Sequence, residues 1–211
     1  MTDQPTTVHG MPRLLLFLGL TAAFVGYFRI WLPGPAAGLQ IIGLEMGEWI
    51  KFLGVGPRRD LFYLPPIAIG LVIALLASTW PNNRPRTWIA RGLAVAVAML
   101  SFPAIAVIQL EPPGEWLLRL SLIGLVAFVA GAGALFSRRA AALPWIWLPI
   151  AAVAVLGAML PTLQYFAVRP VVEAIMRRPI GIGLGVWINS AGLLLVAAVA
   201  LTEFFKLRRA Q

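Results

Sequence analysis

Apolar residues gather along this chain in six long runs that short polar segments separate. Each run holds roughly 20 predominantly apolar residues, the length an α-helix needs to cross a hydrocarbon core of about 30 Å. The runs are 14–32, 61–80, 88–110, 117–137, 143–166 and 181–205. The pattern predicts an all-α, polytopic integral membrane bundle of about six transmembrane helices. These form a single domain, residues 14–205, between a polar N-terminal tail at 1–13 and a basic C-terminal tail at 206–211.

The tryptophans agree with these boundaries. Trp31 and Trp80 end the first and second runs, and Trp88, Trp116 and Trp145 open the third, fourth and fifth. Indole side chains prefer the membrane–water interface. A soluble core would scatter them, so their placement favours the interpretation as membrane spans.

The first run has a second interpretation, as a cleaved secretory signal. Arg13 precedes it, and small residues follow it at 36–38. However, the run is longer than a usual signal core, and Arg29 and Pro33 suit a cleavage region poorly. We therefore expect a helix that is retained.

Two of the connecting segments have helical patterns of their own. In segment 39–53, the apolar residues share one helical face and the polar ones turn away from it, which predicts an amphipathic interfacial helix between the first and second spans. The apolar set is Leu39, Ile42, Met46, Trp49, Ile50 and Leu53, and the polar set is Gln40, Glu45, Glu48 and Lys51. Because this helix carries acidic residues, we expect it to pack on protein, either on its own bundle or on a partner. The second segment, 169–178, predicts a separate two-turn helix between Pro170 and Pro179.

Composition and charge exclude several function classes. The 211 residues are 60% hydrophobic and only 12% charged, with no cysteine and one histidine, His9. Thiolate metal sites, iron–sulfur clusters, cysteine nucleophiles and a bis-histidine haem within one chain are therefore excluded, and we expect no cofactor and no metal. The net charge of +9 lies in clusters between apolar runs. That distribution indicates anionic lipid headgroups rather than nucleic acid.

The orientation follows from the loops. With six spans, the N-terminus, loop 81–87, loop 138–142 and the C-terminus share one side, where basic residues have few acids nearby. The numbers of Lys and Arg residues on the two sides are nearly equal when acids are left out of the count. We expect both termini to be cytoplasmic, and the richness in Arg, Ala, Leu and Gly suggests a bacterial inner membrane.

Few residues could carry chemistry. Two loops on the side opposite the termini carry arginines. If those loops meet, the arginines would form a basic rim that can hold phosphate or carboxylate. The alternative is that they anchor the protein to lipid headgroups. The set is Arg58, Arg59, Arg169, Arg177 and Arg178. In the sixth run, Gly181, Gly185 and Gly192 share a helical face with Asn189. This pattern predicts close helix packing, with ligand contact by Asn189 as the alternative.

Three hypotheses about function follow. The missing catalytic groups and the small-residue face favour a non-catalytic integral membrane subunit or accessory protein of a bacterial membrane assembly, rather than an enzyme. Its partners would be the lipid bilayer and other membrane proteins or a second copy. The alternative is a membrane-embedded substrate-binding subunit of a small-molecule transporter, with a pocket near Asn189. A lipid-modifying enzyme that uses the basic rim is the third.

Overall fold

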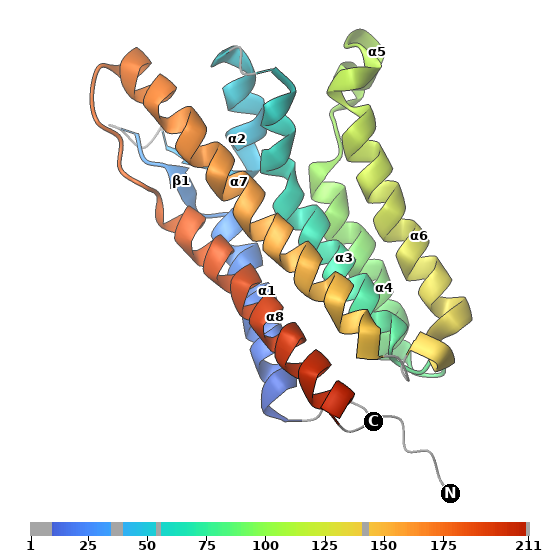
Figure 1. Ribbon diagram of the computed structural model, residues 1–211. Helices are drawn as coiled ribbons and strands as arrows, with labels where there is room; N and C mark the ends of the chain where they lie inside the picture. The colour runs from blue at the N-terminus through green and yellow to red at the C-terminus, as the bar shows by residue number, and fades with distance from the viewer. Residues whose placement is uncertain (1–9, 35–39, 54–55, 141–143, 210–211) are drawn as a thin grey trace, which may run out of the picture.

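The computed structural model describes residues 10–34, 40–53, 56–140 and 144–209. Six main helices lie side by side and run between the two ends of a bundle (Figure 1). They are α1 (Met11–Tyr27), α3 (Leu64–Ser78), α4 (Pro85–Ala98), α6 (Leu117–Ala140), α7 (Trp147–Met176) and α8 (Leu184–Arg209). The fold is therefore all-α apart from two short strands.

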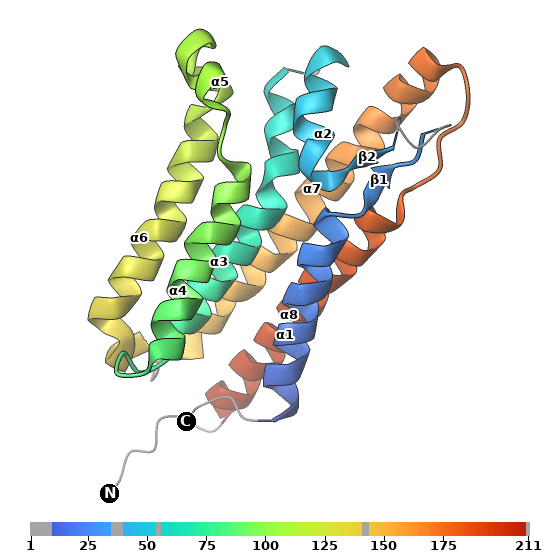
Figure 2. The same cartoon turned by 180° about the vertical axis from the view of Figure 1, so that it is seen from behind.

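The bundle has two distinct ends. The first residue of α1 and the last of α8 lie at one end, which we call the terminal end, and short elements gather at the other, which we call the cap end (Figure 2). The cap end holds strands β1 (Ile30–Leu32) and β2 (Ile41–Ile42), helices α2 (Gly43–Ile50) and α5 (Ile105–Leu110), and the 3₁₀ segments η2 (Lys51–Leu53), η3 (Gly56–Tyr63) and η5 (Pro113–Glu115). Two more 3₁₀ segments, η4 (Met99–Ser101) and η6 (Pro144–Ile146), follow α4 and precede α7.

Four helical segments among the described residues are long and apolar enough to cross a membrane. They are Arg59–Ser78, Leu117–Leu135, Pro144–Met176 and Leu184–Arg209. The chain is thus a helical membrane protein. The number of six crossings stays a prediction, because α1 has 17 residues and α4 has 14.

Helix α3 is the centre of the bundle and packs against α4, α6 and α7. Of the apolar window in Arg59–Ser78, 67% is buried, against 28% of the window in Leu117–Leu135. One apolar core joins α1, α3, α7 and α8, with Ile69, Ile150 and Leu193 in it. Another joins α3, α4 and α6. Helix α6 therefore leaves most of its apolar side chains exposed or only partly buried, as a lipid-facing helix does.

The first apolar run is shorter as a helix than predicted. Helix α1 ends at Tyr27, and β1 pairs antiparallel with β2, with Ile30 opposite Ile42. Trp31 is fully buried, so its indole packs inside the protein and not against lipid headgroups. Its indole N–H donates to the carbonyl of Gly26 at 3.0 Å. An indole with a satisfied N–H gains more from packing among other aromatic rings than from the interface.

Around Trp31 lies a second aromatic and apolar core at the cap end. The rings of Tyr27, Phe62 and Tyr165 meet its indole edge to face, with centroids 6.1 to 6.5 Å away. Met46 of α2 is buried in the same core. The predicted amphipathic helix thus has its apolar side against its own bundle, although Leu39 lies outside the described residues.

The third run, which was predicted as one span, is divided into two helices. Helix α4 ends at Ala98, η4 follows, and α5 starts only at Ile105. Pro103 lacks an N–H and forces extended backbone on the residue before it, and Phe102 has φ −65° and ψ 128°. The buried hydroxyl of Ser101 donates to the carbonyl of Tyr63 at 2.7 Å and ties the break to η3.

The fifth run continues where a break was predicted. Helix α7 runs without interruption through Pro161 and Pro170 to Met176, so the prediction of a separate two-turn helix was wrong. Val168 and Val172, one turn apart on either side of Pro170, are buried in the cap-end core. Their packing holds the helix in register although Pro170 removes one backbone hydrogen bond. The helix ends at Arg177, which is left-handed with φ 51°.

Candidate functional site

Charged side chains are buried at the cap end, which is unusual for a membrane protein and marks the place where function is expected. Arg59, Asp60 and Arg119 are each less than 5% exposed. Partners from neighbouring segments surround them. The cap-end charge cluster comprises Glu48, Lys51, Arg59, Asp60, Tyr63, Glu111, Glu115 and Arg119.

Three stretches of the chain supply this cluster. Segment η3 carries Arg59 and Asp60 at the entry to α3, and α2 with η2 carries Glu48 and Lys51. The connection from α5 to α6 brings the remaining charged members, with prolines 112 and 113 holding its turn. The cluster therefore joins elements up to 71 positions apart in the sequence.

Arg59 binds two carboxylates of that connection. Its Nη2 lies 3.2 Å from Oε2 of Glu111 and 2.7 Å from Oε2 of Glu115. Lys51 also pairs with Glu111. The spacing of these two glutamates around a proline turn aims both at one guanidinium.

Arg119, in the first turn of α6, links the other members. Its Nη1 lies 3.5 Å from Glu48 and its Nε lies 3.6 Å from Asp60. Its Nη2 donates to the backbone carbonyl of Glu115 at 3.0 Å. The guanidinium stacks 4.3 Å above the ring of Tyr63, whose hydroxyl donates to Glu48.

The charges of the cluster nearly balance, with three cations against four carboxylates. Each cation has at least one carboxylate partner, so the cluster ties the segments together. Some buried atoms, such as Oδ1 of Asp60 and Nη1 of Arg59, have no hydrogen-bond partner among the described residues. Such atoms suit ordered water. The described part of the chain holds no group of three metal-ligating side chains.

The five arginines of the predicted rim are not brought together by the contacts of the described residues. Arg59 turns into the cluster, and Arg169 pairs within α7 with Glu173 at 3.0 Å. Arg177 is exposed and Arg178 is partly buried at the end of α7. Arg58 belongs to η3, and its side chain lies outside the described part. The geometry thus gives no support to a shared anion site of this set.

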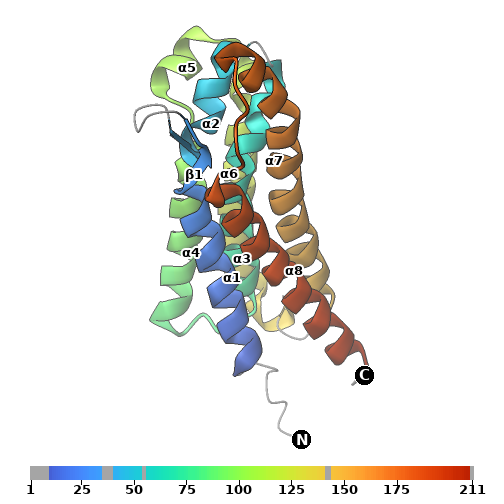
Figure 3. The same ribbon diagram turned by 90° about the vertical axis from the view of Figure 1, so that its left-hand side faces the viewer.

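Asn189 lies at the contact between α8 and α1, which cross closely at the front of Figure 3. It is fully buried, and its Nδ2 donates to the carbonyl of Ala23 at 2.8 Å. A Cβ on Gly192 would come within 2.5 Å of the α1 backbone, and one on Gly185 within 2.7 Å of the carbonyl oxygen of Gly26. Gly181 precedes the helix, so it is not part of that face.

The sequence pattern did not single out Arg119, Asp60 or the paired glutamates as a site. One feature of the sequence could have indicated ion pairs here. Acidic and basic residues are interleaved in the segments that join the spans at the cap end. Only the fold shows which of them meet, since the partners come from three separate segments.

No protein-family model matches this chain, and no curated protein and no solved structure matches it.

Proposed function

We propose that the chain is a non-catalytic subunit or accessory protein of a bacterial membrane assembly, and that it crosses the bilayer six times. Its partners are the lipid bilayer and another membrane protein or a second copy of itself. Glycines of α6 that have no neighbouring helix carry this proposal.

Most glycines inside the helices mark a close approach to another helix. A Cβ built on any of eight of them would meet an atom of a neighbouring helix at 2.3 to 2.8 Å. These eight are Gly19, Gly26, Gly43, Gly70, Gly133, Gly157, Gly185 and Gly192. Small residues let membrane helices approach closely. Most glycines of the described α-helices lie at such a contact, and the exceptions are Gly92 of α4 and two glycines of α6.

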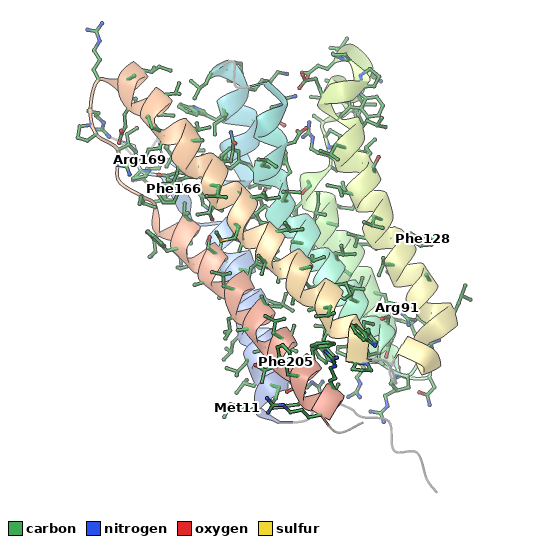
Figure 4. All side chains as sticks on the ribbon, in the orientation of Figure 1. Met11, Arg91, Phe128, Phe166, Arg169 and Phe205 are labelled. Atoms are coloured by element: carbon green, nitrogen blue, oxygen red, sulfur yellow. The ribbon has the colours of Figure 1, made fainter. Side chains whose placement is uncertain are left out.

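Gly124 and Gly131 of α6 have nothing within 4 Å of an added Cβ. Ser121 and Phe128 lie on the same exposed face, at alternating spacings of three and four residues. Phe128 points away from the other helices (Figure 4). A glycine in a helix costs roughly 0.5–1 kcal/mol relative to alanine. Glycines that no helix of this chain approaches support a contact with a helix from another chain.

The contacts of the polar residues favour this hypothesis over a transporter subunit. The hydroxyls of Thr162 and Ser190 lie 2.6 Å apart between α7 and α8, and Asn189 binds α1. These groups therefore join helices in the region where the transporter hypothesis requires a pocket. The paired charges of the cap-end charge cluster likewise support a role without catalysis.

The charge distribution supports termini on the cytoplasmic side. The terminal end exposes six basic side chains of the described residues: Arg13, Arg84, Arg86, Lys206, Arg208 and Arg209. At the cap end, Lys51, Arg59, Arg119 and Arg169 are paired with acids. Exposed cations flanking spans favour the cytoplasmic leaflet and its anionic lipids.

Affinity purification from native membranes tests the proposal. The tagged wild-type chain is compared with a variant that carries Gly124→Leu and Gly131→Leu, and retained proteins are quantified by mass spectrometry. We expect a stoichiometric membrane partner with the wild type and at least a tenfold loss with the variant, because the added side chains block a close helix contact. An untagged second copy in the same cells reveals self-association.

The matched control is Ala198→Leu, which adds the same bulk at an exposed position of α8. It should retain the partner at the wild-type level. A wild-type preparation that holds only lipid would contradict the subunit role. A partner retained equally by all three proteins would place the contact away from α6.

A further inference from the structure

Arg91 of α4 is a buried cation without a counter-charge. It is 4% exposed, and its Nη2 donates to the side-chain oxygen of Asn82 at 2.7 Å. Its Nε and Nη1 have no partner among the described residues. It differs in this from Arg59 and Arg119. These are the other two arginines that are buried among the described side chains, and both bind carboxylates.

The part of the chain that the structure describes offers little that could neutralise Arg91. Loop 79–84 and α4 contain no acidic residue. The acid that the described residues place at the terminal end is Glu203, and it pairs with Lys206 at 3.0 Å. Because a buried and uncompensated charge is strongly unfavourable, the counter-charge of Arg91 is expected from outside the chain.

The guanidinium lies at the start of α4, where an anion is favoured. Side chains of a helix tilt toward its N-terminus, and Arg91 accordingly reaches back to Asn82 in the preceding loop. The helix begins at Pro85 without a side-chain cap, so its positive dipole end stays open. Arg84 and Arg86 are exposed beside it.

A half-exposed tryptophan covers the guanidinium. The ring centroid of Trp88 lies 4.8 Å from the guanidinium carbon of Arg91, and the residue is 55% exposed. Its indole N–H donates to the carbonyl of Asn82 at 3.0 Å. Figure 4 shows Arg91 toward the same end as Met11 and Phe205, where lipid headgroups would lie.

We infer that Arg91, with Arg84, Arg86 and the first turn of α4, binds a phosphate group, and that an anionic phospholipid, whose phosphate charge no choline offsets, supplies it in the leaflet around the terminal end. A guanidinium fork matches two oxygens of a phosphate, and exposed arginines add charge around it. The indole of Trp88 then packs at the level of the lipid glycerol. This inference is independent of the partner helix proposed for α6.

The test reconstitutes the full chain in nanodiscs of phosphatidylcholine alone or mixed with phosphatidylglycerol. Thermal stability is measured for the wild type, Arg91→Gln and the matched control Arg208→Gln, which removes an exposed arginine at the same end. We expect phosphatidylglycerol to raise the midpoint of the wild type and of Arg208→Gln but not that of Arg91→Gln. The headgroup of phosphatidylcholine has no net charge, because its choline offsets the phosphate. In phosphatidylcholine alone, Arg91→Gln should therefore match or exceed the wild type, since it removes a cation that this lipid does not neutralise.

Native mass spectrometry provides a second readout. Phosphatidylglycerol retained by Arg91→Gln should fall about tenfold, as for the loss of a charge-assisted hydrogen-bond pair. Arg91→Lys keeps the charge without the fork and should give an intermediate value, which keeps the test open if the glutamine variant does not fold.

Inorganic phosphate added to phosphatidylcholine nanodiscs separates the two sources of the anion. Stabilisation of the wild type by phosphatidylglycerol alone supports a lipid site. Stabilisation by inorganic phosphate that disappears in Arg91→Gln supports the phosphate site and overturns its assignment to lipid. Equal responses of the wild type and the Arg91 variants to both probes would overturn the inference.

Discussion

At the scale of single residues, the buried arginines differ in what surrounds them. Arg119 contacts two carboxylates, a backbone carbonyl and an aromatic ring, and its side chain is 2% exposed. Asp60 beside it is 4% exposed. Burial of such charges is tolerable only while the partners stay together, so removal of one partner leaves the other charged in a poorly solvated site.

We therefore expect Arg119→Met to lower the free energy of unfolding by about 3–5 kcal/mol, the range for breaking a buried ion pair. Unfolding in detergent, followed by circular dichroism, measures the loss. Adding Asp60→Asn should recover part of it, because the stranded carboxylate is then neutral. Lys206→Met, which removes a cation exposed to 60%, is the control and should change stability little. If Arg119→Met and Lys206→Met lowered the free energy of unfolding equally, burial of the charge would have no special role.

At the scale of elements, glycine position decides how closely two helices approach. Gly192 faces the backbone of α1, where an added Cβ would meet the amide nitrogen of Ala23 at 2.5 Å. A backbone atom cannot turn aside as a flexible side chain can, so the helices would have to separate. Gly124 lies in open space on α6. The two glycines sit in similar apolar helices and differ only in their neighbours.

Gly192→Leu should destabilise the purified chain by about 1–3 kcal/mol or more, as overpacking does, whereas Gly124→Leu should stay within about 0.5 kcal/mol of the wild type. The measurement is again unfolding in detergent, without any partner protein. Equal stability of the two variants would contradict the close contact of α1 with α8. Loss of stability in Gly124→Leu would show that its effect on partner retention is indirect.

At the scale of the whole molecule, the charges are distributed asymmetrically between the ends. Exposed and largely unpaired cations lie at the terminal end, while four cations of the cap end are bound to acids and Arg29 and Arg177 are exposed there. The two ends differ more in unpaired cations than in their total numbers of Lys and Arg, because pairing removes several cap-end cations from contact with lipid. This difference favours a cytoplasmic terminal end.

Thiol labelling in intact cells tests this orientation, since the chain has no cysteine of its own. Asn83→Cys places a single thiol in the exposed loop before α4, and Gly114→Cys places one in the exposed turn before α6. We expect a membrane-impermeant maleimide to label position 114 in intact cells and position 83 only after permeabilisation. The reverse pattern would show the opposite orientation, and labelling of both positions in intact cells would contradict an odd number of crossings between them.

The sequence by itself determined the class of the protein and the approximate place of its helices. Long apolar runs and few charges exclude a soluble domain, because hydrophobic length and composition act through each segment alone. The glycine and asparagine positions of α8 also pointed to a face with small residues, although not to α1 as its neighbour.

Only the tertiary structure decided which breaks occur and which charges meet. Pro103 interrupts its run while Pro170 does not, because the valines around Pro170 are held in a core formed by distant segments. Arg59 and Arg119 are paired but Arg91 is not, because the carboxylates near the first two come from elements remote in sequence. Such contacts depend on the order of helices around the bundle, which local patterns of hydrophobicity do not encode.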